Sequence, residues 1–296
     1  MLILKPYAHL TIWGGNRLAK YTDDATDGIG HLYTVRGNKE DSNYIMNGSN
    51  KGRTLYDYFA DNKLRWGLEA YEDFPVSIAL VDAKENLSVQ VHPTKEIAAM
   101  YEKVAVGKNE SFYIIEEPEK GCMINGCKCD TSEQLKACVA DGKWNEVIDY
   151  LPVEKGNYVY VTAGTLHAMT KGALTYEIEE NCTYTYRLYD YDRVDAKGNK
   201  RALDVEKSIM SIDVNKKSYT RTYNEGEILE ERYATKLIKD VDIYENNTSN
   251  IVCLTLIDGC GRIDGIDFNP GMSMILEPSE KMYGVNIKKA IVARIF

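Results

Sequence analysis

The sequence lacks the features that mark membrane, secreted and nucleic-acid-binding proteins. No apolar run approaches the roughly 18–20 residues that a membrane-spanning helix needs, and the first apolar stretch ends after four residues, too early for a signal peptide. Basic residues are outnumbered, with 36 Lys and Arg against 45 Asp and Glu, so a basic surface for nucleic acid is not expected. The seven cysteines follow no regular framework. We therefore expect a cytoplasmic protein with reduced thiols and neither a membrane nor a nucleic-acid partner.

Proline is also scarce, with 7 residues in 296, whereas tyrosine is abundant, with 22. Many of the tyrosines alternate with polar residues, which is the pattern of a half-buried β-strand. The hydrophobic content of 44% with 27% charged residues is typical of a globular chain with a real core. The composition therefore favours a folded protein that is built mainly from strands.

Hydrophobic periodicity, capping residues and prolines together predict the elements along the chain. The expected strands cover residues 74–82, 87–92, 111–116, 158–162, 174–178, 183–189, 251–257, 272–276 and 291–296. The expected helices cover residues 55–71, 94–103, 135–140, 144–151 and 203–213. This pattern predicts a mainly antiparallel β protein with helical insertions, in which residues 1–225 form a first domain and residues 226–296 a smaller, all-β domain.

Two of the four histidines stand near other groups that bind metals. Gln90 and His92 lie two residues apart on one predicted strand, so their side chains project to the same face. Glu110 begins the next strand, and His167 follows a turn. Two imidazoles, a carboxylate and an amide oxygen suit a borderline divalent ion such as Zn²⁺. Each residue alone is better explained by an ordinary structural role, such as a hydrogen-bonded histidine or a solvated charge.

The spacing of Gly156, Gly164 and His167 resembles the second cupin motif, with Thr162 where proline usually stands. The wider pattern resembles type I mannose-6-phosphate isomerases and their short bacterial form. The segments that carry the resemblance are residues 87–93, 107–110, 163–168 and 185–195. It is strong from about residue 74 to 213 and faint in the C-terminal part. The resemblance implies cupin-type double-stranded β-helix (jelly-roll) barrels with helical insertions.

The resemblance also implies an activity, the interconversion of mannose 6-phosphate and fructose 6-phosphate through an enediol, with a phosphosugar as substrate. It implies one Zn²⁺ and a set of site residues. The implied zinc ligands are Gln90, His92, Glu110 and His167, and the implied catalytic residues are Arg187, Glu177 and Lys108. A structural ion pair between Arg187 and Glu177 is the alternative for those two residues.

Three positions depart from the family pattern: His31 lies in a segment that usually carries Glu and Trp, Ala79 replaces a usual lysine, and Thr183 stands where an Asp is common. These changes leave two main alternatives open. The chain is a metal-dependent isomerase, or it is a sugar-binding cupin that keeps the metal but has a different substrate or no turnover. A third alternative, an iron-dependent cupin oxygenase, fits less well because only two histidines accompany Gln90 and Glu110.

Overall fold

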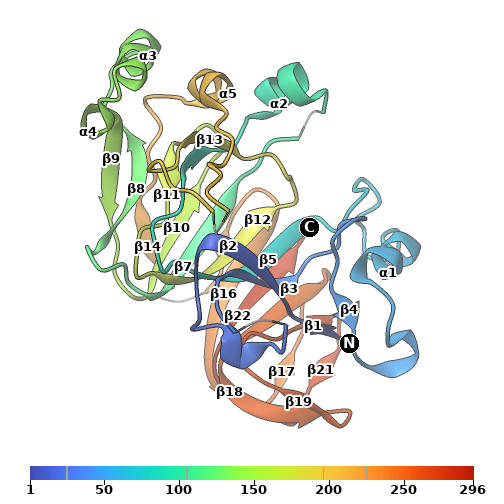
Figure 1. Ribbon diagram of the computed structural model, residues 1–296. Helices are drawn as coiled ribbons and strands as arrows, with labels where there is room; N and C mark the ends of the chain where they lie inside the picture. Colours follow the sequence, from blue (N-terminus) through green and yellow to red (C-terminus); the bar gives the residue numbers. More distant parts are fainter. Residues whose placement is uncertain (25, 105, 196, 224–225) are drawn as a thin grey trace. The chain divides into compact units, whose positions relative to one another are not determined.

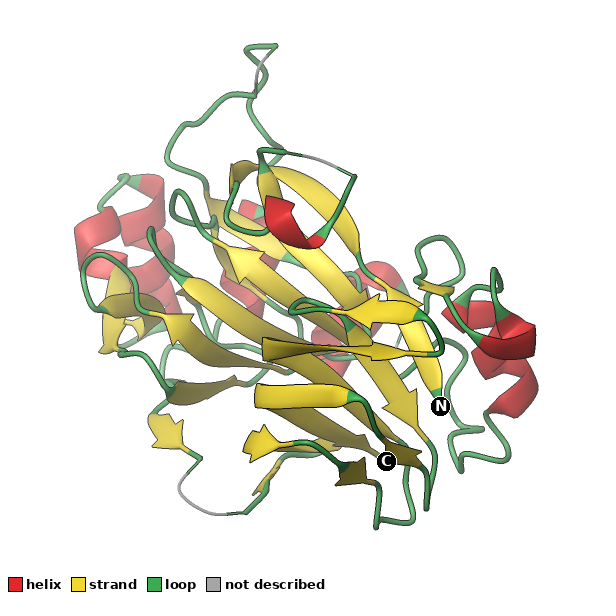
Figure 2. Ribbon diagram, turned by 90° about the horizontal axis from the view of Figure 1, so that it is seen from below, coloured by secondary structure: helices red, strands yellow, loops and turns green. Residues whose placement is uncertain are grey.

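The computed structural model describes residues 1–24, 26–104, 106–195, 197–223 and 226–296. Strands are the predominant regular structure, and the helices that accompany them are short (Figures 1 and 2). The main ladders run antiparallel. Among the described residues, no helix is long and apolar enough to cross a bilayer. The expected mainly β fold with helical insertions is confirmed.

The contacts divide the chain into two compact units. The first unit holds Met1–His9, Asn16–Leu80 and Tyr223–Phe296, and the second holds Leu10–Gly15 and Val81–Thr222. The boundary between Thr222 and Tyr223 lies close to the expected division at residue 225. Most of the first 80 residues, however, group with the C-terminal strands instead of with the metal-binding segments. The division into domains of residues 1–225 and 226–296 stays a prediction.

The first unit is built on one large antiparallel sheet. Its strand order is β15 (Ile228–Leu229), β16 (Tyr233–Val241), β22 (Val285–Ile295), β18 (Val252–Ile263), β20 (Ser273–Leu276), β1 (Leu2–Lys5) and β4 (Tyr44–Ile45), with β19 (Ile266–Phe268) beside β18. β17 (Tyr244–Glu245) pairs with β21 (Lys281–Met282), and β3 (Ile29–Val35) also belongs to this unit. The boundary between the units falls within β2 (Tyr7–Gly15) and β5 (Val76–Asp82). Buried Phe268, Leu254, Met274 and Ile287 lie in the core of the unit.

The second unit places two antiparallel layers around the candidate metal ligands. One layer has the order β14 (Thr220–Thr222), β10 (Asn157–Val161), β7 (Glu110–Glu116) and β12 (Leu174–Glu180). The other has the order β13 (Tyr186–Tyr189), β6 (Val89–Val91), β11 (His167–Ala168), β8 (Cys122–Cys127) and β9 (Ile148–Pro152). Each of these strands overlaps an expected strand, except β8, β9, β11 and β14.

The α-helices are α1 (Leu55–Asn62), α2 (Lys95–Glu102), α3 (Ser132–Ala140), α4 (Trp144–Val147) and α5 (Val205–Ser211). Capping side chains mark the start of the three longer α-helices, whereas α4 and α5 begin without a side-chain cap. The hydroxyls of Thr54, Thr94 and Thr131 each accept a hydrogen bond from a backbone N–H of the first turn, at the start of α1, α2 and α3. In Figure 1, α2, α3 and α5 lie at the end of the second unit that also holds β13.

Two predicted helices are wrong at their C-terminal ends. The helix expected over residues 55–71 stops at Asn62, and Leu64, expected on its apolar face, is 76% exposed. Turns follow, with Gly67 in the left-handed region at φ 71°. The helix expected over residues 144–151 stops at Val147, because the next five residues form β9 and pair with β8. That pairing is non-local, so helical periodicity could not reveal it.

Candidate metal centre

The two layers of the second unit bring three of the expected metal ligands to one point. Gln90 lies on β6 and pairs in register with His167 at the start of β11. His92 is two residues beyond Gln90 and therefore lies on the same face. Glu110 is the first residue of β7 in the opposing layer. Pro93 follows His92, lacks a backbone N–H and ends the β6 ladder at the site.

The three ligand groups are almost fully buried and close together. His92 Nε2 lies 2.9 Å from Glu110 Oε2, and His167 Nε2 lies 2.8 Å from Glu110 Oε1. Each of the three residues is 1% exposed, and their ligand atoms all lie within 4.8 Å of one another, a grouping that can hold a metal ion. The imidazole rings of the two histidines are 4.9 Å apart, so both side chains point into the same space.

Backbone carbonyls fix which nitrogen of each histidine faces the carboxylate. His92 Nδ1 lies 3.2 Å from the carbonyl oxygen of Tyr184, and His167 Nδ1 lies 2.9 Å from that of Thr165. Because a carbonyl only accepts, we assign a proton to Nδ1 in both rings. The Nε2 lone pairs then face Glu110. This is the arrangement in which a histidine ligand is oriented by a hydrogen bond from its other nitrogen.

The electrostatics of the cluster fit a bound cation. Burial lowers the pKa of His92, and the Lys108 ammonium lowers it further, so the imidazole is neutral. Among the described residues, Glu110 Oε1 is buried without a hydrogen-bond donor. A buried carboxylate oxygen that faces nitrogen lone pairs is costly unless a cation lies between them. The donor set of two imidazoles and one carboxylate therefore fits a divalent metal.

Gln90 reaches the same point through its side-chain amide. Its Nε2 lies 3.4 Å from His167 Nε2, and its Oε1 accepts a hydrogen bond from Ser88 Oγ at 3.4 Å. A half-turn of the amide exchanges its nitrogen and oxygen at almost no change in shape. Gln90 is thus placed to offer an oxygen as a fourth ligand, and its role as a ligand stays a prediction.

Lys108, Glu177 and Glu179 lie beside the metal cluster. Lys108 forms an ion pair with Glu179, and its Nζ is 3.6 Å from Glu110 Oε2. Burial acts to lower the pKa of Lys108, but Glu179, Glu110 and Glu177 outweigh burial and raise this pKa above its ordinary value. The lysine therefore remains a fixed positive charge. Glu110, Glu177 and Glu179 also form a second close group of ligand atoms.

Glu179 was not among the sequence-predicted site residues. It lies two residues after Glu177 on β12, so both side chains share a face, and it pairs in register with Glu110. The sequence offered one signal for it, namely a second acidic residue at an alternating position of a strand that is otherwise buried. The pairing with Glu110 required knowledge of the register.

Arg187 lies on the metal-facing side of β13, opposite Gln90. Its Nε donates to Ser88 Oγ at 3.2 Å and its Nη1 to the carbonyl oxygen of Ala202 at 3.3 Å. Within the described part of the chain, its guanidinium has no carboxylate partner, so the alternative of an ion pair with Glu177 finds no support. A β-bulge follows Arg187, and Tyr189 pairs with Val89 on the opposite face. Regular strand alternation over residues 185–189 predicts that Tyr189 shares the face of Arg187, and the bulge makes this prediction wrong.

The three residues that depart from the family pattern lie outside this cluster. His31 is on β3, where its ring stacks on Tyr33 at 5.4 Å. Ala79 is a buried residue of β5, and Thr183 is an exposed residue before β13. None of the three takes part in the grouping of His92, Glu110 and His167.

Comparisons with known proteins show the family to which this chain belongs. Residues 1–124 match the family model of the phosphomannose isomerase type I catalytic domain. The mannose-6-phosphate isomerase ManA of Bacillus subtilis is 36% identical over 214 residues, which cover 72% of this chain and 68% of that protein. This chain belongs to the type I phosphomannose isomerase family. The mannose-6-phosphate isomerase of Streptococcus mutans is 35% identical over 217 residues, or 73% of this chain and 68% of that protein.

Solved structures extend the likeness to the whole chain. The crystal structure of the mannose 6-phosphate isomerase from Bacillus subtilis superimposes with a TM-score of 0.81 at 25% identity and covers 99% of both chains. A putative mannosephosphate isomerase from Archaeoglobus fulgidus superimposes with a TM-score of 0.77 at 16% identity and shares the fold. The expected cupin fold is thereby confirmed, including the C-terminal part in which the sequence resemblance is faint.

Proposed function

We propose that this protein is a metal-dependent aldose–ketose isomerase that interconverts mannose 6-phosphate and fructose 6-phosphate through an enediol intermediate. Membership of the type I family supports this activity. The observation that carries the proposal is the buried convergence of His92, Glu110 and His167, within reach of charged groups suited to proton transfer. We infer that Zn²⁺ is the resident ion, with Gln90 as fourth ligand, and that the enzyme works in the cytoplasm.

A divalent ion in this cluster supplies a Lewis acid for the oxygens of the sugar. The remaining chemistry falls to side chains. We assign to the Glu177 carboxylate the transfer of the proton between the two adjacent carbons of the sugar. Lys108 contributes a fixed positive charge beside the site, because its carboxylate neighbours keep it protonated.

We propose that the Arg187 guanidinium binds the anionic oxygens of the substrate or of the enediolate. Its planar, always-charged fork presents donors in a fixed plane, and two neutral hydrogen-bond acceptors, instead of a carboxylate, orient it. An unneutralised cation of this kind can interact fully with a developing negative charge.

A coupled assay on both hexose 6-phosphates with the zinc-loaded protein tests the proposal. Glu177→Gln should lower kcat by about 10²-fold or more, because the shape is retained but the base is lost. Glu180→Gln is the matched control: Glu180 lies on the opposite face of β12 and bonds to Asn109, so turnover should persist.

The altered-substrate or non-catalytic sugar-binding cupin is the outcome that would replace this proposal. It predicts no turnover of either hexose 6-phosphate with zinc restored, together with measurable binding of a sugar. Activity on another phosphosugar in a small panel would instead show that the enzyme has a different substrate. The departures from the family pattern at Ala79, Thr183 and His31 would then be the first candidates for the cause.

A further inference from the structure

A second cavity lies on the outer face of the layer that carries His167. On β8, Asn125 pairs with His167 and shares the face of the metal cluster, so its neighbour Ile124 points to the opposite face. Tyr150 pairs with Ile124 and lies on that outer face as well. Both residues line a cavity of about 570 Å³. The thickness of the sheet therefore separates this cavity from the candidate metal centre.

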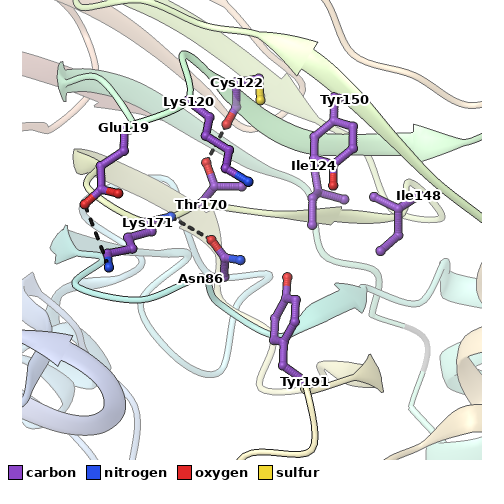
Figure 3. A pocket seen from close by; sticks show the side chains of 10 residues that line it. All are labelled: Asn86, Glu119, Lys120, Cys122, Ile124, Ile148, Tyr150, Thr170, Lys171 and Tyr191. Carbon is purple, nitrogen blue, oxygen red and sulfur yellow. Dashed lines mark hydrogen bonds and ion pairs between the residues drawn. The ribbon is translucent and has the colours of Figure 1, made fainter. Parts of the chain in front are cut away.

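The cavity combines an apolar floor with hydroxyl-bearing walls. Ile124 and Ile148 form apolar surface, and the phenol hydroxyls of Tyr150 and Tyr191 point into the space between them (Figure 3). The hydroxyl oxygen of Tyr191 is buried and, among the described residues, lacks a hydrogen bond of normal geometry, although the Asn86 side chain lies close enough to interact with it. Because a buried hydroxyl favours a well-formed hydrogen bond, Tyr191 and Asn86 together are suited to bonding a molecule in the cavity.

The charges in the lining of the cavity and directly beside it largely cancel. Lys171 Nζ lies 3.5 Å from a carboxylate oxygen of Glu85 and 4.0 Å from one of Glu119, and its backbone N–H donates to Asn86 Oδ1 at 2.9 Å. Lys120 adds one more positive charge, so the lining holds two lysines and Glu119, and Glu85 supplies a second negative charge through its ion pair with Lys171. A doubly charged phosphate would meet the Glu119 carboxylate here and would gain little net attraction.

We propose that this outer cavity binds a neutral saccharide of one or two hexose units. The C–H faces of a sugar ring can pack on the tyrosine rings and on the isoleucines, while its hydroxyls can bond to Tyr191, Asn86 and Lys120. The volume falls within the range of small-molecule sites, about 300–1,000 Å³. The proposal goes beyond the isomerase activity and does not depend on it, because it concerns the opposite face of the sheet.

Titration of the full-length, zinc-loaded protein tests this site. The probes are D-mannose, a mannose disaccharide and inorganic phosphate, and the reporters are the ¹³C-labelled methyl groups of Ile124 and Ile148. The disaccharide should shift both methyl signals with a Kd of about 1 mM. Inorganic phosphate should leave both signals in place.

Variants locate the bound sugar. Tyr150→Ala should weaken binding about tenfold, because it removes an aromatic wall. Tyr191→Phe keeps the ring and should still weaken binding about fivefold, through the lost hydroxyl. Arg187→Ala and Tyr283→Ala should leave binding unchanged; Tyr283 is 54% exposed, comparable to Tyr150 at 48%.

Three results would overturn the proposal. One is the absence of any saccharide binding at about 10 mM sugar. Another is binding that survives Tyr150→Ala and Tyr191→Phe but disappears in Arg187→Ala, because the sugar would then occupy the isomerase site. The third is a response of the two isoleucine methyl groups to phosphate and not to the sugars.

Discussion

Replacement of Arg187 tests whether its guanidinium has a catalytic or a structural role. In the folded protein this guanidinium makes two hydrogen bonds, to Ser88 Oγ and to the carbonyl oxygen of Ala202. Both acceptors are neutral, and at about 0.5–1.5 kcal/mol each, their loss in Arg187→Ala should lower the free energy of unfolding by about 1–3 kcal/mol. A folded domain survives a loss of that size.

The same replacement should lower turnover strongly, although the protein stays folded. Removal of one oriented donor to a developing negative charge typically costs about 10²–10³-fold in kcat, so we expect Arg187→Ala to lower kcat by at least about 10²-fold. Arg187→Lys should not rescue it, because lysine keeps the charge but loses the planar fork. Metal content should remain that of the natural protein, since Arg187 is not a ligand.

Arg201 supplies the matched control. Its guanidinium holds the buried Asp190 carboxylate through contacts of 2.6 and 2.8 Å, so its role is structural. Arg201→Ala should lower stability and leave kcat nearly unchanged. The assay is steady-state turnover of mannose 6-phosphate beside urea unfolding of all three variants. Normal turnover by a refolded fraction of an unstable Arg187→Ala protein would refute the catalytic role.

Three further predictions concern the metal ligands, acid stability and the core. His92→Ala should abolish metal binding, whereas Gln90→Ala should only weaken it, because a neutral amide oxygen is the weakest donor of the set; elemental analysis after dialysis measures both. Burial acts to raise the pKa of Asp190, but hydrogen bonds to two arginines lower it below its ordinary value. The contribution of the Asp190 carboxylate to the free energy of unfolding is therefore present above about pH 3.9 and is lost as pH falls through the folded-state pKa. Urea unfolding at pH 7 and at acidic pH measures this loss of free energy, which should be smaller in Arg201→Ala than in the natural sequence. Phe268→Ala, at a fully buried position, should cost about 3–5 kcal/mol in the free energy of unfolding, measured by denaturant titration.

The sequence was most informative where chemistry and strand alternation coincide. Gln90 and His92 share a face because residues two apart on a strand do so, and the structure places them on one face. The capping residues Thr94 and Thr131 also indicated two of the helices. These are local signals, so they could be recognised without knowledge of the fold.

The features that the sequence did not reveal depend on non-local pairing. Glu179 belongs to the site because it lies opposite Glu110, and Tyr189 changes face because a bulge follows Arg187. Residues 148–151 have a helical pattern but form a strand, since β8 offers them backbone partners. In each case a register that links distant segments outweighs the local preference.

Removal and restoration of the metal is the most direct test of the central claim, that His92, Glu110 and His167 hold the ion on which isomerisation depends. The measurement is the rate of fructose 6-phosphate formation from mannose 6-phosphate by chelated protein, before and after one equivalent of Zn²⁺ is added. We predict no turnover by the chelated protein and full recovery at one ion per chain, with no recovery in His167→Ala. Undiminished turnover by metal-free protein, or recovery in His167→Ala equal to that of the natural sequence, would contradict the account.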